Sequence, residues 1–185
     1  MTPQDFNILL IGMRGCGKTT VGSALAAMLK RPFVDLDQRT LANFATSSVS
    51  EVWKKHGEAA WREAEARSLI DVLEAHGQVI ALGGGTPMVE PARQRIQADR
   101  SRGAAKVVYL TCSTGELRRR LARMPGVRPS LTGKDPSDEV EAVLASREAT
   151  YREIADFTLD VTSLSPDDAA THAAKMIRSG RSRSR

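Results

Sequence analysis

The first forty residues hold a glycine-rich stretch whose side chains suit phosphate chemistry. The stretch GMRGCGKTT, residues 12–20, fits the pattern G-x-x-x-x-G-K-[ST] with Gly12, Gly17, Lys18 and Thr19. In this pattern the glycine backbone wraps phosphate oxygens, the lysine reaches the terminal phosphates and the hydroxyl can ligate Mg²⁺. An apolar strand precedes it and a helical pattern follows, which is the context that the motif requires. We therefore predict a nucleotide-phosphate loop whose contacts come from Gly15, Cys16, Gly17, Lys18, Thr19 and Thr20.

Two carboxylates follow in the stretch FVDLDQ, residues 33–38. Asp35 and Asp37 stand one residue apart at the expected end of a buried strand, where a charge is costly unless it is paired or metal-bound. Beside a transferring phosphate, one acid can hold Mg²⁺ and another can accept the proton of an acceptor hydroxyl. A continuing strand would point the two side chains to opposite sides, whereas a turn at its end can bring both to the phosphate. A surface turn, a metal pair and an acid/base pair all remain open on these residues alone.

The rest of the chain disfavours two large classes of nucleotide-binding protein. There is no Asn-Lys-x-Asp stretch of the kind that reads guanine in GTPases. Motor, transport and helicase ATPases usually carry an aspartate at the end of a strand beside the phosphate loop, and neither VIALGGG nor VVYLTC contains an acid. These absences favour a phosphotransferase that does not activate water.

Further groups suited to anions lie downstream. GEAAWREAE, residues 57–65, places Trp61 and Glu65 on one helix face with Arg62 beside them. Three consecutive glycines occupy 83–85, Arg128 lies in a long polar segment, and Arg152 lies near the end of a helical pattern. Arginine forks suit carboxylate and phosphate oxygens. Taken singly, Arg62 and Arg152 read as solvated charges on helix faces and the three glycines read as a tight turn; together they favour a functional site.

The order of the expected elements defines the fold class. Strand-length apolar stretches at 7–12, 32–36, 78–83, 106–111 and 156–161 alternate with helical patterns at 18–30, 58–75, 90–101, 113–122, 137–154 and 166–178. Such alternation predicts an α/β domain with a parallel sheet covered by helices on both faces. The intervening polar segment 122–136 is long for a loop in a compact domain, so we expect it to be functional or disordered.

Composition bounds the remaining possibilities. A chain of 185 residues is most simply one domain, and its longest apolar runs are too short to cross a membrane. The net charge is +5, but without the four arginines of RSGRSRSR (178–185) there remain 23 basic and 22 acidic residues. We expect a cytoplasmic monomer with a disordered Arg/Ser tail at 179–185, no disulfide, no structural zinc and no nucleic-acid partner.

Together these motifs resemble shikimate kinase over nearly the whole chain, to about residue 178. The resemblance is carried by GMRGCGKTT, DLD, GEAAWRxxE, LGGG, VRP in a basic loop and YR at 151–152, in that order. It implies a five-stranded parallel sheet in the order 2-3-1-4-5 within one P-loop kinase domain, 1–178. It also implies a mobile lid at about 122–136 and a substrate-binding region at about 35–65.

The resemblance further implies the activity and the roles of individual residues. ATP with Mg²⁺ would phosphorylate the 3-hydroxyl of shikimate, a step toward chorismate and the aromatic amino acids. Asp37 would be the base toward that hydroxyl, Asp35 with Thr19 would hold Mg²⁺, and Lys18 with Arg128 would act on the phosphates. Arg62, Arg152 and Gly84 would bind the substrate, and Arg123 and the loop around Pro166 would contact adenine. A kinase of another hydroxy acid such as gluconate, or a regulatory or nucleic-acid-associated P-loop protein, remains the alternative.

Overall fold

The computed structural model describes residues 6–46, 48–123, 135 and 137–180. Arg128, most of the predicted lid and residues 181–185 lie outside that part of the chain. The described residues form one five-stranded parallel sheet in the order β2-β3-β1-β4-β5, as predicted. No helix among them is long and apolar enough to cross a membrane.

The strands are short and their carboxyl ends lie together at one edge of the sheet. They are β1 (Asn7–Ile11), β2 (Phe33–Asp35), β3 (Val79–Ala81), β4 (Ala105–Thr111) and β5 (Phe157–Asp160). All five residues of β1 are buried, because a central parallel strand has helices over both faces. The register pairs Ala81 of β3 with Asp35 of β2 on one side and with Leu10 of β1 on the other. The segments that leave β1, β2 and β3 therefore emerge side by side.

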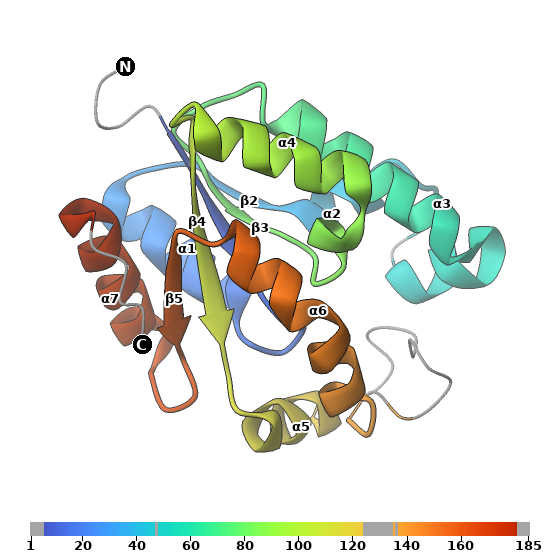
Figure 1. Ribbon diagram of the computed structural model, residues 1–185. Coiled ribbons are helices and arrows are strands. Elements are labelled where there is room, and N and C mark those ends of the chain that lie inside the picture. Colours follow the sequence, from blue (N-terminus) through green and yellow to red (C-terminus); the bar gives the residue numbers. More distant parts are fainter. Residues whose placement is uncertain (1–5, 47, 124–134, 136, 181–185) are drawn as a thin grey trace.

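Helices cover both faces of this sheet (Figure 1). On one face α1 (Lys18–Leu29) packs against α7 (Pro166–Ser179). The other face carries α4 (Glu90–Ser101) and α6 (Val140–Ile154), both of which contact β4. α5 (Thr114–Ala122) lies beyond the carboxyl end of β4, and the short helix η1 (Thr86–Met88) follows the three glycines. The predicted helices 90–101, 113–122 and 137–154 agree with these bounds to within three residues.

The region between β2 and β3 is more helical than we predicted. α2 (Leu36–Leu41) begins directly after Asp35, and α3 (Val49–Val72) starts nine residues before the predicted 58–75. α3 is interrupted at Gly57, whose backbone (φ 81°, ψ 165°) is not helical. Val49, Val52 and Trp61 form a small second core there, packed by Leu41, Phe44 and Trp53. At the other end of the chain α7 extends to Ser179, one residue into the predicted tail.

Candidate active site

The phosphate loop joins β1 to α1 and leaves the helix N-terminus available to an anion. Gly12 has φ 141°, and a Cβ there would collide with the carbonyl oxygen of Leu110, so a side chain cannot replace it. Gly17 is the N-cap of α1 in the left-handed conformation and makes no side-chain cap. The first N–H groups of the helix are therefore not capped by the side chain of the N-cap residue, which suits a helix end that binds phosphate.

Lys18 lies along the inside of this loop and is 9% exposed. Its Nζ donates hydrogen bonds of 2.9 Å to the carbonyl oxygens of Gly12 and Met13. Cys16 is also buried, with its Sγ 3.9 Å from Nζ. The predicted lysine is thus held at the loop, within the glycine backbone that would surround a phosphate chain.

Asp35 and Thr19 are in direct contact. The Oγ1 atom of Thr19 donates to Oδ2 of Asp35 at 2.7 Å. The other oxygen of Asp35 accepts from the backbone N–H of Gln38 at 3.2 Å and so caps α2. This arrangement brings together the two oxygen groups that we expected to serve one Mg²⁺, which prefers carboxylate and hydroxyl oxygens beside phosphate.

Asp37 lies in the first turn of α2 and lines the same cleft as Asp35. The strand ends at Asp35, so the alternation of a strand no longer separates the two side chains. Its Oδ1 would be 2.8 Å from a Cβ placed on Gly83. Asp37 therefore faces the glycine turn, while Asp35 faces the phosphate loop.

The three glycines 83–85 form a turn that charged side chains approach from three directions. Glu65 and Asp37 abut Gly83, Arg147 lies 3.7 Å from the Cβ position of Gly84, and the guanidinium of Arg62 occupies the Cβ position of Gly85. A side chain on Gly83 or Gly85 would displace these groups. The turn is glycine because polar side chains fill the space that a methyl group would need.

Arg62 is held at this turn by two acids. Its Nη1 donates to Oε2 of Glu65 at 2.9 Å, and its Nε and Nη2 donate to Oε1 of Glu58 at 3.1 and 3.0 Å. Glu65 is fully buried, and its second oxygen accepts from Oγ1 of Thr86 at 2.6 Å. The ring of Trp53 lies 5.4 Å below the guanidinium carbon. A buried charge is retained only when it is paired in this way, and the pairing fixes where Arg62 points.

The structure does not bring Arg152 to the site. Its side chain is 58% exposed and donates from Nε and Nη2 to Oε1 of Glu148, so the role predicted for it as a substrate ligand is not supported. Arg147, which we did not predict, lies on the inner side of α6 near Gly84 and is hydrogen-bonded to Tyr151. Tyr151 is itself buried and donates to the carbonyl oxygen of Gly84, and burial raises the pKa of its hydroxyl.

The position of Arg147 could have been predicted from the spacing of residues on the helix. Residues four apart share one face of a helix, whereas neighbours lie about 100° apart. Arg147 is four residues before the buried Tyr151, and Arg152 directly follows Tyr151. The arginine that shares a helix face with Tyr151 is Arg147, whereas Arg152 is only next to Tyr151 in the sequence.

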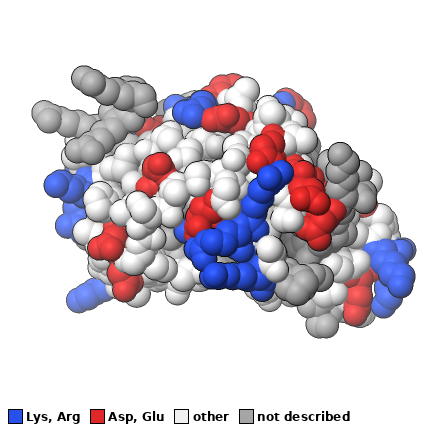
Figure 2. All heavy atoms as spheres, turned by 90° about the horizontal axis from the view of Figure 1, so that it is seen from below, with Lys and Arg blue, Asp and Glu red and all other residues white. Residues whose placement is uncertain are grey.

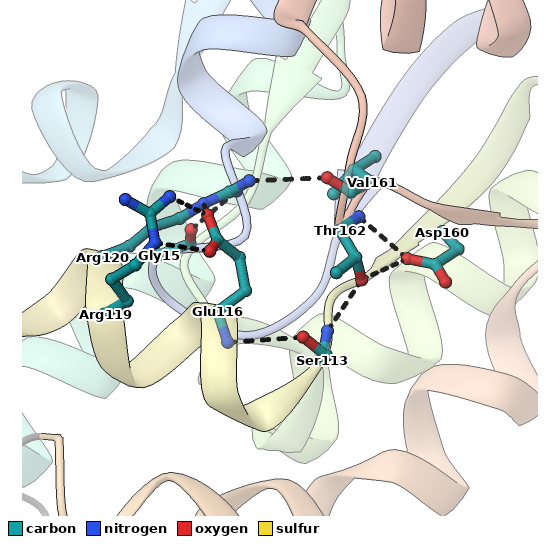
Figure 3. Close-up of polar contacts among 8 residues, drawn as sticks. All are labelled: Gly15, Ser113, Glu116, Arg119, Arg120, Asp160, Val161 and Thr162. Atoms are coloured by element: carbon teal, nitrogen blue, oxygen red, sulfur yellow. Dashed lines mark hydrogen bonds and ion pairs between the residues drawn. The ribbon is translucent and has the colours of Figure 1, made fainter.

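The opposite end of the cleft contains a second arginine that we did not predict. Arg120 donates from Nη1 to the carbonyl oxygen of Gly15 at 3.3 Å, from Nη2 to that of Val161 at 3.4 Å and from Nε to Glu116 at 2.7 Å (Figure 3). Hydrogen bonds from Arg119 and Arg120 lower the pKa of Glu116 to about 2. Arg120 thus ties α5 to the phosphate loop and to the segment before α7.

One cleft of about 920 Å³ joins the phosphate loop, the two aspartates and Gly84, while Arg62 and Arg147 are not among the residues that line it. Its lining includes most of the predicted residues: Gly15, Cys16, Gly17, Lys18, Thr19, Thr20, Asp35, Asp37, Gly84, Arg123 and Pro166. Figure 2 views the face at the carboxyl ends of the strands, where Lys and Arg side chains gather with Asp and Glu at their border. Clustered positive charge in a cleft attracts anionic ligands.

The site combines a phosphate loop, a hydroxyl and a carboxylate beside that loop, and a second region with two arginines. This combination defines a P-loop kinase. The sequence model of the shikimate kinase family matches residues 14–178. The chain belongs to this family of transferases, which use ATP and Mg²⁺.

Individual relatives agree with that assignment. The chain is 42% identical to shikimate kinase 2 of Escherichia fergusonii over 157 residues, covering 84% of this chain and 83% of the relative. It superposes on shikimate kinase from Acinetobacter baumannii in complex with shikimate with a TM-score of 0.85, at 30% identity, covering 95% and 94% of the two chains. A gluconokinase from Sinorhizobium meliloti, at 18% identity and a TM-score of 0.55 over 94% and 92%, shares the fold alone.

Proposed function

We propose that this protein transfers the terminal phosphoryl group of ATP to the 3-hydroxyl of shikimate. The observation that carries the proposal is the convergence of Arg62 and Arg147 on the turn 83–85, with Asp37 beside the same turn. Two guanidinium groups around a glycine turn suit a small ligand with one carboxylate. A carboxylate at Asp37 suits a ligand that also presents hydroxyls. Membership of the shikimate kinase family supports the same ligand.

Asp37 is the residue proposed to orient and deprotonate the acceptor hydroxyl. It lies between the glycine turn and the cleft, while Asp35 is engaged with Thr19. Phosphoryl transfer is catalysed mainly by positioning and by stabilising charge on the transferred group. We assign that stabilisation to Lys18, to the N-terminus of α1 and to Arg128, which lies outside the described residues.

Thr19 and Asp35 are the residues proposed to hold Mg²⁺. Their oxygens are already 2.7 Å apart, at the carboxyl end of β2 and the first turn of α1. When bound there, the ion would neutralise charge on the phosphates. The donor set of one hydroxyl and one carboxylate leaves room for phosphate oxygens and water, which Mg²⁺ retains in such sites.

The far end of the cleft is the proposed adenine site. Arg123 and Pro166 both line it, as does Arg120, whose guanidinium is fixed by Gly15, Val161 and Glu116. A planar guanidinium can stack on a base. Residues 122–136 are proposed as the lid over the phosphates and residues 35–65 as the substrate-binding region.

We also propose that the protein works as a cytoplasmic monomer. Both cysteines are buried and free, so neither is available to link two copies of the chain through a disulfide. Gel filtration with light scattering, with and without substrates, tests the monomer.

The proposed substrate is tested by ADP release against a panel of hydroxy acids that includes shikimate and gluconate. We expect ATP- and Mg²⁺-dependent turnover with shikimate and little with gluconate, and no turnover by Lys18→Met with either. Gluconate turnover equal to or above that with shikimate would overturn the proposal. Phosphorus NMR of the product identifies the hydroxyl that is modified.

A further inference from the structure

The guanidinium group of Arg62 is contacted by two carboxylates that differ in burial. Glu65 is fully buried and accepts from Nη1 at 2.9 Å. Glu58, four residues before Arg62 on α3, accepts from Nε and Nη2 at 3.1 and 3.0 Å, and its side chain is 46% exposed. Two acids therefore share one cation, and Glu58 reaches it from the solvent side.

The contact with Glu58 is the weaker of the two. Nε and Nη2 form an edge of the guanidinium group that a carboxylate can engage with both of its oxygens in parallel. Glu58 uses Oε1 alone for both nitrogens. Ion pairs that are exposed to water and lie four residues apart on a helix contribute little to stability. Glu58 is thus a ligand of Arg62 that a stronger carboxylate ligand can replace.

The position of Arg62 is fixed by groups other than Glu58. Glu65 holds Nη1 from the inner side, and Oγ1 of Thr86 donates to the second oxygen of Glu65 at 2.6 Å. Cζ, Nη1 and Nη2 lie 2.4, 2.3 and 2.6 Å from the Cβ position of Gly85, so a flat face of the guanidinium group rests against the glycine turn. The ring of Trp53 lies 5.4 Å from Cζ. These contacts remain when the charge of Glu58 is removed.

The edges of the guanidinium group are the places where a second carboxylate can bind. Gly85 covers a face of the group, and Glu65 already accepts from Nη1. A substrate carboxylate at Nε and Nη2 must replace Glu58, whereas one at Nη1 and Nη2 shares Nη2 with it. Either arrangement brings two negative charges to one nitrogen, and like charges at this distance repel. The charge of Glu58 therefore opposes binding of a carboxylate at Arg62.

We propose that Glu58 is a displaceable internal ligand of Arg62 that lowers the affinity of the protein for its carboxylate substrate. The inference rests on the proposed function, because it assumes that Arg62 binds the substrate carboxylate. Once released, Glu58 lies at the start of the helical segment that follows Gly57, where a negative charge is favourable. Every carboxylate ligand of Arg62 competes with the same internal group, so all of them lose affinity by the same factor.

Glu58→Gln tests this role, because it keeps the shape of the side chain and removes its charge. The KM and the Kd for shikimate are expected to fall about two- to fivefold, the range that an exposed ion pair supports. The kcat and the Kd for ATP are expected to change by less than about 1.5-fold, since only ground-state contacts to the carboxylate are altered. An unchanged KM would overturn the proposal. A higher KM would also overturn it, and would show that Glu58 orients Arg62 for the substrate.

Two analogues of shikimate separate the effect of charge from that of shape. Cyclohexenecarboxylate has the ring and the carboxylate without the hydroxyls, and Glu58→Gln should lower its inhibition constant by the same factor as the KM for shikimate. The methyl ester of shikimate keeps the hydroxyls but has no negative charge, so its kcat/KM should be the same in the variant and the wild type. An equal gain for the ester, or an unchanged inhibition constant for the ring carboxylate, would contradict competition for Arg62.

Glu63 and Arg67 form a matched control pair on the same helix. They are also four residues apart, and their side chains are 64% and 73% exposed. Glu63→Gln removes the same charge from α3 but leaves both partners of Arg62 in place, so the KM for shikimate should stay at the wild-type value. A fall as large as that in Glu58→Gln would assign the effect to the overall charge of the helix and would overturn the proposal. Thermal melts establish that both variants are folded.

The same measurements distinguish a failure of this inference from a failure of the proposed function. If the wild-type protein does not phosphorylate shikimate, the proposed function fails and this inference fails with it. If the wild-type protein is active and Glu58→Gln binds shikimate no more tightly, only the present inference fails.

Discussion

Thr19 and Asp35 meet through a 2.7 Å hydrogen bond between the first turn of α1 and the end of β2. The carboxylate that caps α2 is thus the one placed beside the phosphate loop. One residue performs both tasks because the helix begins where the strand ends.

Asp35→Asn separates these two tasks. Asparagine still caps a helix, so we expect a folded protein whose shikimate KM stays within about twofold of wild type. The Mg²⁺ concentration for half-maximal activity should rise by about 10- to 100-fold, the usual cost of disturbing a metal's surroundings. Titrating Mg²⁺ at saturating ATP measures this. A rise in the shikimate KM as large as the change in Mg²⁺ requirement would contradict the division of roles.

Asp37→Asn should lower turnover much more than nucleotide affinity. Loss of a general base costs roughly 10² to 10⁴ in rate, whereas Asp37 faces the glycine turn rather than the phosphate loop. Steady-state kcat and an equilibrium Kd for ATP separate the two effects. Near wild-type turnover would remove Asp37 as base or orienting group.

Arg147→Met and Arg152→Met form a matched comparison on one helix. A hydrogen bond to a charged group contributes about 1.5 to 3 kcal/mol, so losing Arg147 should raise the shikimate KM by at least about tenfold. Arg152 pairs with Glu148 at the surface, and its loss should change the KM by less than about twofold. The reverse ranking would restore Arg152 to the substrate site.

Gly57→Ala should destabilise the protein by about 1 to 3 kcal/mol, because alanine cannot adopt φ 81° and ψ 165° without strain. Gly115→Ala is the control: it lies in α5 with no atom near its Cβ position and no positive φ. There alanine should stabilise by about 0.5 to 1 kcal/mol. Urea unfolding compares the two variants. A neutral Gly57→Ala would show that the interruption of α3 relaxes at no cost.

We expect the carboxylate of Glu116 to make the stability of the folded protein fall at acidic pH. Its pKa is about 2 in the folded protein against 4.5 for a free side chain, so the stabilisation that it provides is present above about pH 4.5 and is lost as the pH falls toward 2. Glu116→Gln should therefore be less stable than wild type near neutral pH, with the difference shrinking below pH 4.5. Thermal unfolding between pH 2 and 7 measures it. A difference independent of pH would exclude the carboxylate as its source.

Periodicity and motif context were enough to predict the parallel sheet and the phosphate loop. The order of the strands was predicted from the family resemblance. They were not enough for α2, which has only six residues and depends on the Asp35 cap and on packing against α3. The predicted helix at 58–75 begins next to Gly57, where the backbone leaves the helical region. Local signals predict elements well when they are long, and poorly when neighbouring segments stabilise them.

The residues of the site also differ in how well they can be predicted from the sequence. Residues within the motif, such as Lys18 and Thr19, were predictable because their spacing has a chemical reason. Arg120 was not, because its partners are the backbone carbonyls of Gly15 and Val161, which the fold alone brings near it. Arg147 was accessible to an argument from helix faces. Arg152 was chosen as a neighbour of Tyr151 in sequence, and its side chain pairs with Glu148 at the surface.

The small second core contains the residues responsible for the intrinsic tryptophan fluorescence of the protein. Both tryptophans of the chain, Trp53 and Trp61, belong to it, and the guanidinium of Arg62 lies over the Trp53 ring. Indole emission therefore originates wholly in the proposed substrate-binding region, beside a cation proposed to engage the substrate. The fluorescence of the unmodified protein reports on that region separately from the nucleotide half of the molecule.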